Sequence, residues 1–339
     1  MSLPTPPGPA FAEMALLIRG YQLSRMIQVA VALGLADELS GGPQFAHTLA
    51  LRVGADPQML LRLCRALAAF GVFEIGADGR IGQSVHSATL RKTAAPTLYH
   101  AARYWDAPHQ RESWANLEHA VRTGSPAFEG VYHMPKFEYL KLHADEADLF
   151  DLFMQHGPDE RQAAVAAASD FTGARVVVDV GGGNGALLAA VLGRYPEVRG
   201  LLFDQEAVVA GAARALGGLA ERVEIQAGSF FERVPPGGDV YLLSLILHDW
   251  DDAHALKILT NVRTAMQPHQ RLLVIERVLG ETEGPDPMTF LSDINMMVNL
   301  HGRERTREEF AALFGKSGFG PPRLYRTTSP FLVVETWSV

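Results

Sequence analysis

A glycine-rich turn is the motif in this sequence that most directly indicates a ligand. The turn follows an apolar run, Val176–Val180, and contains Gly181, Gly183 and Ala186 at the spacing of a dinucleotide-binding fingerprint. Asp204 lies near the distance at which such sites place a carboxylate for a ribose. Glycines permit positive φ angles and let a ligand approach the backbone closely. This spacing alone is compatible with NAD(P) and with S-adenosylmethionine (SAM).

The carboxylate that precedes the turn favours SAM over NAD(P). Asp179 comes shortly before the first glycine, where it would repel a pyrophosphate and attract the ammonium group of a methionine moiety. SAM carries no phosphate, and its ribose hydroxyls still suit Asp204. A glycine turn that binds no ligand is the third interpretation.

His248 has the residue type and the position of a general base. It follows the apolar run Val240–Leu247, beside the edge at which a ligand is expected. A phenol has a pKa of about 10 and is therefore a poor nucleophile at neutral pH. A neutral imidazole can take its proton while the oxygen attacks a methyl group. Loss of a sulfonium charge drives such a transfer, so no metal is required.

A carboxylate on the far side of the imidazole would fix its tautomer and stabilise the imidazolium. Glu276 and Glu304 are the candidates for this role. The alternative interpretation gives His248 only a structural role at the start of the next helix, where Asp251 or Asp252 is the expected N-cap.

Alternating strands and helices must position these residues. After residue 170, apolar runs alternate with helical segments, which predicts a parallel, doubly wound α/β sheet followed by a terminal hairpin. The runs are Val176–Val180, Leu201–Phe203, Val223–Ile225, Val240–Leu247 and Leu272–Ile275. Ligands bind at the carboxyl ends of such strands. Polar, glycine or aromatic residues lie at or beyond the ends of all five runs: Asp179, Asp204, Gly228, Ser229, Phe230, His248, Trp250 and Glu276.

The first half of the chain has a helical pattern. An apolar stretch over Phe11–Leu35 predicts a long helix whose wide apolar face has contacts on more than one side. Asp56-Pro57 indicates the start of another helix, and residues 72–75 with residues 80–82 predict a hairpin. Helix, helix and hairpin is the order of a winged-helix fold. The acidic chain and its few cations in this region favour a packing or dimerisation module over DNA binding.

Composition limits the function classes further. The chain has 339 residues, a formal net charge of −8 and a single cysteine, Cys64. The length suggests two domains, and the acidic charge argues against a nucleic-acid binder. One cysteine excludes an internal disulfide and a multi-cysteine zinc site. No apolar run of ~18 residues and no signal peptide are visible, so a cytoplasmic protein that acts on small molecules is expected. The charged fraction of 20% is slightly low and suggests apolar surface that a partner covers.

Three motifs follow the helical N-terminal region in order: Asp179–Gly185, His248–Trp250 and Gly302–Thr306. Together they resemble the SAM-dependent small-molecule O-methyltransferases of the plant caffeate and flavonoid type. The resemblance is strongest to bacterial relatives that methylate polyketide and other aromatic natural products, and it covers nearly the whole chain. It implies methyl transfer from SAM to a phenolic hydroxyl in secondary metabolism such as antibiotic biosynthesis, with S-adenosylhomocysteine as the other product.

The resemblance also implies an architecture. It places a Rossmann-like, doubly wound catalytic domain over residues 169–339 and an all-α, winged-helix-like dimerisation domain over residues 1–100. Residues 101–168 would form a helical connector that lines the substrate pocket. In the family the dimerisation domain forms an intertwined homodimer and contributes to the pocket of the partner subunit. No nucleic acid, membrane or metal is implied.

The resemblance assigns roles to residues of this chain. His248 corresponds to the catalytic base, and Glu276 and Glu304 correspond to the glutamates that brace it. The residues assigned to SAM are Asp179, Gly181, Gly183, Gly185, Asp204, Ser229, Phe230, Ser244 and Trp250. The residues assigned to the substrate pocket, with a role in the helix core as the alternative, are Phe150, Met154, Asn295, Met296 and Asn299.

The chain departs from the family pattern at two positions of the cofactor site. Ser229 replaces the usual aspartate and lacks its charge, which could weaken SAM binding, although the serine can still accept a hydrogen bond from the adenine amino group. Ser244 stands where the plant enzymes have a lysine. Two alternatives stay open: a SAM-binding member with altered chemistry, such as decarboxylation, hydroxylation or N- or C-methylation, and an NAD(P)-dependent oxidoreductase. Retention of His248 favours O-methyl transfer.

Overall fold

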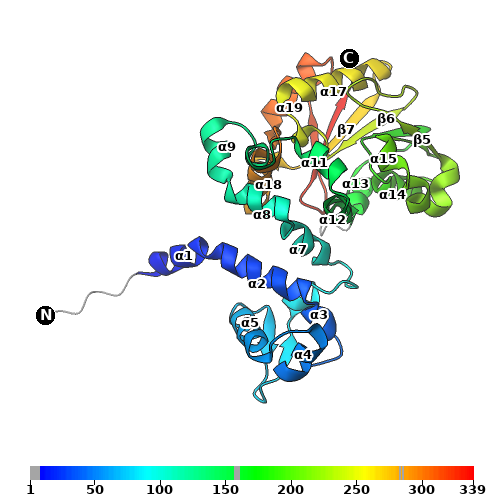
Figure 1. Cartoon of the computed structure of the whole chain (residues 1–339). Coiled ribbons are helices and arrows are strands. Elements are labelled where there is room, and N and C mark those ends of the chain that lie inside the picture. Colours follow the sequence, from blue (N-terminus) through cyan, green and yellow to red (C-terminus); the bar gives the residue numbers. More distant parts are fainter. Residues whose placement is uncertain (1–7, 156–160, 282–283, 285) are drawn as a thin grey trace. The chain divides into compact units, whose positions relative to one another are not determined.

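The computed structural model describes residues 8–155, 161–281, 284 and 286–339. The chain divides into two compact units (Figure 1). The first unit consists of Met1–Arg111 and Leu140–Pro158, and the second consists of Glu112–Tyr139 and Asp159–Val339. Helices of the expected connector, residues 101–168, therefore occur in both units. The three predicted domain ranges stay a prediction.

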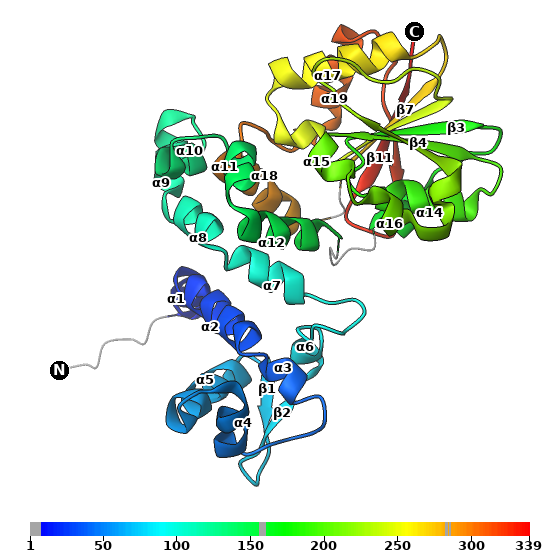
Figure 2. The same ribbon diagram turned by 45° about the vertical axis from the view of Figure 1, so that its right-hand side comes forward.

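A seven-stranded sheet forms the centre of the second unit (Figure 2). In spatial order its strands are β10 (Arg323–Arg326), β11 (Leu332–Trp337), β7 (Arg271–Glu276), β6 (Val240–Ser244), β3 (Val176–Val180), β4 (Arg199–Asp204) and β5 (Val223–Ala227). The strands from β7 to β5 are parallel, and the C-terminal hairpin adds two antiparallel strands. The predicted doubly wound sheet is confirmed. Its chain order reverses between β3 and β6, which is where sheets of this kind bind ligands.

The strand β6 ends earlier than the sequence predicts. Its apolar run continues to Leu247, but the ladder stops at Ser244 because Leu245 adopts a positive φ of 56°. The chain then forms a short 3₁₀ turn, η2 (Leu247–Asp249), that contains His248. The run remains apolar because Leu247 is fully buried although it lies outside the strand. His248 is therefore presented by a turn and not by the end of a strand.

Helices cover both faces of the sheet, and alternate strand residues pack against them. The covering helices are α17 (Asp252–Ala265) and α19 (Arg307–Lys316) on one face, and α13 (Arg161–Ala168) and α14 (Ala186–Arg194) on the other. Val178 of β3 belongs to the first core cluster, and its neighbour Val177 belongs to the second. Burial on both faces explains why these strands are continuous apolar runs.

Shorter elements complete the second unit. They are α9 (Leu117–Thr123), α10 (Ala127–Tyr132), α15 (Glu206–Val209), α16 (Ala212–Leu216), η1 (Gly217–Arg222), β8 (Val278–Leu279), α18 (Pro287–Asn299) and β9 (Arg305–Thr306), while α8 (Pro108–Ala115) and α11 (Lys136–Leu142) each extend across a boundary between the units. The parallel pairing of β8 with β9 places Arg305 beside Val278, just beyond the end of β7. The segment 302–306 is thereby brought to the carboxyl edge of the sheet.

The first unit begins with helices that the sequence predicts as one. The predicted long helix is wrong as a single element: the chain forms α1 (Pro9–Ile18), α2 (Gly20–Ala32) and α3 (Leu35–Glu38). Arg19 leaves the helical region between α1 and α2, and Gly34 takes a positive φ of 68° before α3. Glycines next to both breaks lower helix propensity. The remaining elements are α4 (Ala46–Val53), α5 (Pro57–Ala69), β1 (Phe73–Ile75), β2 (Ile81–Gln83), α6 (Val85–Ala88), α7 (Tyr99–Trp105) and α12 (Ala144–Gln155).

The predicted order of helix, helix and hairpin is present in this unit. Asp56 accepts hydrogen bonds from the amides of Gln58 and Met59 and so caps α5, as predicted. β1 and β2 form the predicted antiparallel hairpin. A separate core of buried apolar side chains holds α2, α3, α4, α5 and the hairpin together.

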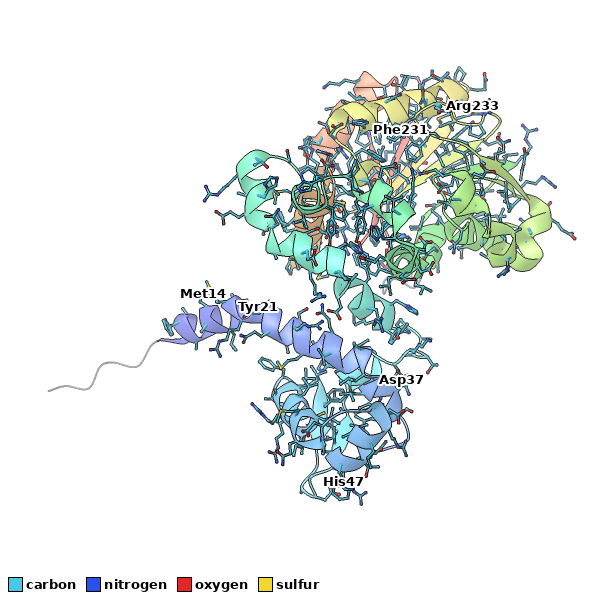
Figure 3. All side chains as sticks on the ribbon, in the orientation of Figure 1. Met14, Tyr21, Asp37, His47, Phe231 and Arg233 are labelled. Atoms are coloured by element: carbon cyan, nitrogen blue, oxygen red, sulfur yellow. The ribbon has the colours of Figure 1, made fainter. Side chains whose placement is uncertain are left out.

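The helices α1 and α2 carry exposed apolar side chains. Figure 3 shows Met14 and Tyr21 on this pair of helices, where their exposed fractions are 56% and 72%. Phe11, Leu17 and Ile18 are exposed to a similar degree. No helix in the described parts of the chain is long and apolar enough to cross a membrane.

Candidate active site

The glycine turn joins β3 to α14 at the carboxyl edge of the sheet. Gly181, Gly183 and Gly185 have φ angles of 70°, 62° and 84°, which L-residues with side chains rarely adopt. A Cβ on Gly181 would lie 2.5 Å from Cδ1 of Ile246, so the turn also needs glycine for space. The amide of Gly183 donates to Oδ2 of Asp204 at 2.9 Å. The predicted ribose residue thus lies directly against the turn.

Asp179 is the most unusual charged group beside this turn. It is only 1% exposed, and neither carboxyl oxygen has a hydrogen-bond partner among the described residues. Burial, with a smaller contribution from Asp204, raises the pKa of Asp179 to about 7. Burying a carboxylate costs free energy, and the amide of Leu188 and the charge of Arg161 offset only part of this cost. A ligand ammonium beside Asp179 would offset more of it, and an anionic pyrophosphate would not.

Aromatic rings lie on the other side of the turn. Cε1 of Phe230 would be 3.4 Å from a Cβ on Gly181, and the ring of Trp250 is edge-on to Phe230 with centroids 6.4 Å apart. Phe231, labelled in Figure 3, is edge-on to Trp250 with a centroid distance of 4.6 Å. The role of Phe230 and Trp250 in enclosing an adenine stays a prediction.

Two serines stand at positions that the sequence assigns to the cofactor. The hydroxyl oxygen of Ser229 accepts a hydrogen bond from the amide of Phe231 at 3.2 Å. Ser244 ends β6, and its buried hydroxyl has no hydrogen-bond partner among the described residues. Their contact with a cofactor stays a prediction.

His248 is held by two glutamates in different ways. Its Nδ1 lies 3.1 Å from Oε1 of Glu304, and that oxygen also accepts a hydrogen bond from Ser292 at 2.6 Å. Oε1 of Glu276 instead accepts a hydrogen bond from the backbone amide of His248 at 3.0 Å. Of the two candidates, Glu304 therefore faces the imidazole and Glu276 fixes the backbone. With Nδ1 as the donor to Glu304, Nε2 is the other ring nitrogen, and it lies 3.5 Å from Oδ1 of Asp249.

The pKa values of these groups depend on one another. Burial would lower the pKa of His248, but the carboxylates of Glu304 and Asp249 outweigh it and raise the pKa to about 9. Burial raises the pKa of Glu276 to about 7, and the charge of His248 only partly opposes this. For Glu304, burial is outweighed by His248, which lowers the pKa. The arrangement stabilises an imidazolium, which is the product of base catalysis.

The segment that carries Glu304 also contacts the backbone of the histidine turn. A Cβ on Gly302 would lie 1.8 Å from the carbonyl oxygen of His248, so only glycine fits there. The fully buried Arg305 donates hydrogen bonds to the carbonyl oxygens of Leu247 and Trp250. No sequence pattern indicates these roles, because backbone carbonyls are present at every residue.

The predicted substrate residues fall in both units. Asn295, Met296 and Asn299 are buried on α18, and Oδ1 of Asn295 accepts hydrogen bonds from Asn299 at 2.8 Å and from Trp114 at 3.3 Å. Phe150 and Met154 lie on α12 of the first unit. The role of all five in substrate contact stays a prediction.

Family models match most of the chain. An O-methyltransferase domain covers residues 114–320, and an O-methyltransferase dimerisation domain covers residues 15–94. The first match includes the glycine turn, His248 and both glutamates.

Individual relatives agree with these family matches. The chain is 40% identical over 323 residues to a mitomycin biosynthesis 6-O-methyltransferase from Streptomyces lavendulae, with 94% of this chain and 92% of the relative covered. It is 38% identical over 321 residues to the phenazine O-methyltransferase PhzM from Lysobacter antibioticus, with 94% of each covered.

A solved structure is similar over nearly the whole length. It is the O-methyltransferase NcsB1 from neocarzinostatin biosynthesis, in complex with SAM and 2-hydroxy-5-methyl naphthoic acid. It has a TM-score of 0.79 and 31% identity, and the match covers 93% of this chain and 96% of that chain. The chain therefore belongs to the family of SAM-dependent O-methyltransferases.

Proposed function

We propose that this enzyme methylates a phenolic hydroxyl of a small aromatic molecule and that His248 is its general base. The observation that carries the proposal is the hydrogen bond of Nδ1 to Glu304, which leaves Nε2 as the proton acceptor. His248 is 8% exposed, so the proton is transferred where water competes little. Relatives named for mitomycin and phenazine O-methylation, and a relative bound to a hydroxylated naphthoic acid, support an aromatic acceptor.

The residues around the glycine turn would hold the cofactor. Asp179 would pair with the ammonium group, Asp204 would face the ribose, and Phe230 with Trp250 would enclose the adenine. The bound cofactor supplies a methyl group activated by a positively charged sulfur. The glycine turn would bring backbone amides and glycine Cα atoms close to the ligand. The positive φ angles of its glycines permit this close approach.

Proton transfer defines the part played by His248. Nε2 would take the proton of the acceptor hydroxyl as its oxygen bonds to the methyl carbon, while the bond from that carbon to sulfur breaks and S-adenosylhomocysteine leaves. Glu304 would stabilise the resulting imidazolium. Without ligands the pKa of His248 is about 9, so the ring holds a proton at neutral pH. A cation paired with Asp179 opposes that charge, and we expect the pKa of His248 to fall when the cofactor binds.

The first unit supports a second copy of the chain as the partner, in a homodimer. The dimerisation domain of the family covers residues 15–94, and exposed apolar side chains of α1 and α2 supply a surface of the required kind. We propose that these helices pack against a second copy of the chain.

A methyl-transfer screen tests the proposed function. The enzyme is incubated with SAM labelled in the methyl group and with a panel of phenols, hydroxynaphthoic acids and polyketide-like aromatics. We expect label in a methyl ether formed at the acceptor hydroxyl and one S-adenosylhomocysteine per methyl group. Conversion of an aromatic compound without S-adenosylhomocysteine would indicate the altered chemistry of the alternative hypothesis. Tight NADPH binding without SAM binding, measured by calorimetry, would exclude the proposal altogether.

A further inference from the structure

Arg305 is buried beneath the turn that carries His248. Its side chain is 0% exposed, and it donates to the carbonyl oxygen of Leu247 at 2.7 Å and to that of Trp250 at 2.8 Å. The same guanidinium donates to Oδ1 of Asp252 at 2.9 Å and 3.2 Å. The two carbonyls lie on either side of His248 and Asp249. Residues 247–250, which we call the base turn, are therefore held at both ends by one side chain.

Neighbours of Arg305 in the sequence contact the same turn. Gly302 lies against the carbonyl of His248, and Glu304 is hydrogen-bonded to its imidazole. Within four consecutive residues, the chain thus contacts the backbone, the ring and both ends of the base turn. Gly302, Glu304 and Arg305 therefore determine where the imidazole and the Trp250 ring lie relative to each other.

We propose that Arg305 is a positioning residue that fixes the base turn, so that His248 and the cofactor-facing Trp250 are held in one geometry. This inference rests on the proposed role of His248 as the base. It assigns Arg305 no contact with a substrate; Arg305 acts through the two carbonyls that it binds.

The chemistry of the side chain fits this role better than a role in stability alone. A planar guanidinium can donate to three acceptors in fixed directions, whereas a lysine ammonium is a single point charge. Burying such a cation has a large desolvation cost, and apolar residues commonly stabilise a core as well or better. The charge also acts on the site, because Arg305 lowers the pKa of Glu276. A buried arginine here is therefore better explained by the geometry of the base turn.

The charged groups around His248 determine how displacement of the base turn would change its pKa. Glu304, Asp249 and Glu276 raise its pKa, while Lys136 acts on Asp249 and Arg277 acts on Glu304. Loosening the turn would move the imidazole away from Glu304, the carboxylate that contributes most to this increase. The pKa of His248 would then fall towards its ordinary value.

The test compares Arg305→Lys with Arg303→Lys in the full-length enzyme. Arg303 is a matched control because it binds the other oxygen of Asp252 at 2.9 Å, is 44% exposed, and has its second ion pair with Glu309, away from the base turn. For Arg305→Lys we expect kcat to fall roughly 10- to 100-fold through misplacement of the base. We expect the KM for SAM to rise about threefold as Trp250 shifts. Arg303→Lys should leave both constants unchanged.

The readout that separates positioning from stability is the titration of His248, followed by NMR in histidine-labelled protein. We expect its pKa to fall by about one unit in Arg305→Lys and to stay constant in Arg303→Lys. This measurement needs no turnover, so it distinguishes failure of this inference from failure of the proposed function, which an active His248→Ala variant would show. A lowered melting temperature with unchanged kcat and unchanged His248 titration would overturn the positioning role.

A second variant keeps the test decisive if Arg305→Lys does not fold. Asp252→Asn leaves the two carbonyl contacts possible but weakens the carboxylate that orients the guanidinium, and Asp252 is 50% exposed. We expect it to shift the His248 titration in the same direction, by a smaller amount, and to lower kcat about two- to fivefold. No shift and no change of kcat in this variant would overturn the proposal.

Discussion

Proton transfer by His248 depends on a single ring nitrogen. Nδ1 is 3.1 Å from Glu304, so Nε2 is the atom that can receive the hydroxyl proton. His248→Ala removes this acceptor but leaves Asp179 and the glycine turn intact. We expect kcat to fall by roughly 10²–10⁴ with little change in SAM affinity. Labelled-SAM turnover and calorimetry measure the two quantities.

A control for this variant is His47→Ala. His47 is exposed on α4 of the first unit, as Figure 3 shows, and lies outside the catalytic unit. It should keep the activity of the unmodified enzyme. Full activity in His248→Ala would show that another group, or none, accepts the proton.

Asp179 links cofactor binding to stability. Its pKa is about 7 in the folded chain, against an ordinary value of 3.8 for an aspartate, so folding disfavours the charged form. This destabilisation begins above pH 3.8, grows as the pH rises and is complete above about pH 7. Asp179→Asn removes it. We expect the ligand-free variant to gain about 1–4 kcal/mol of unfolding free energy at pH 8 and less at pH 5.5.

The same substitution should weaken SAM binding, because the amide cannot neutralise an ammonium. Urea unfolding at the two pH values and calorimetry with SAM measure the effects in one protein. A variant that binds SAM as tightly as the parent enzyme would exclude Asp179 from the cofactor site. If Asp179→Asn were less stable than the parent enzyme at pH 8, the conclusion that burial of the Asp179 carboxylate destabilises the fold would be contradicted.

At the scale of elements, the packing of segment 302–306 against the base turn leaves no room for a side chain. A Cβ on Gly302 would lie 1.8 Å from the carbonyl oxygen of His248, so Gly302→Ala must move one of the two backbones. We expect a loss of at least about 2 kcal/mol of unfolding free energy and a large loss of kcat. Gly315→Ala is the control, because a Cβ there has no neighbour within 4 Å and its helix gains propensity.

Denaturant unfolding of both variants measures these changes in unfolding free energy. Equal stability of Gly302→Ala and the parent enzyme would mean that the two segments are not in contact as described. Loss of stability in Gly315→Ala would show that the helix α19, and not this contact, is sensitive to an added methyl group.

The sequence predicts strands more reliably than the turns that follow them. Strands buried on both faces are continuous apolar runs, which is why the pattern locates β3, β4, β6 and β7. The strand β5 is less buried and alternates apolar with polar residues. The pattern misses the end of β6 because Leu247 is buried in the core although it lies beyond the ladder. It misses the break between α1 and α2 because apolar spacing continues through Arg19 and Gly20.

Site residues at strand ends can likewise be predicted, because topology brings those ends together. Asp179 and Asp204 lie at the ends of neighbouring parallel strands and so at the same edge of the sheet, whereas His248 follows β6 through the turn η2. Arg305 cannot be located from the sequence, since two of its partners are carbonyl groups of the backbone. The different tasks of Glu276 and Glu304 are also beyond the sequence, because one binds an amide and the other binds a ring.

At the scale of the whole molecule, we expect the exposed apolar side chains of α1 and α2 to be covered by a second copy of the chain. Leu17 and Ile18 are 72% and 70% exposed at the end of α1, among other apolar side chains of α1 and α2. A double variant, Leu17→Asp with Ile18→Asp, places charges where the proposed dimer buries methyl groups. We expect it to weaken dimerisation by about 3–6 kcal/mol and to sediment as a monomer at micromolar concentration.

The matched control for the dimer is Val121→Asp, which adds a charge at a 68% exposed apolar residue of α9 in the second unit. It should remain dimeric, because the dimerisation domain of the family covers residues 15–94 only. A dimer that survives the double substitution would move the interface away from α1. A parent enzyme that is itself monomeric at micromolar concentration would leave the exposed apolar side chains of α1 and α2 unexplained by self-association, and would require a different partner for them.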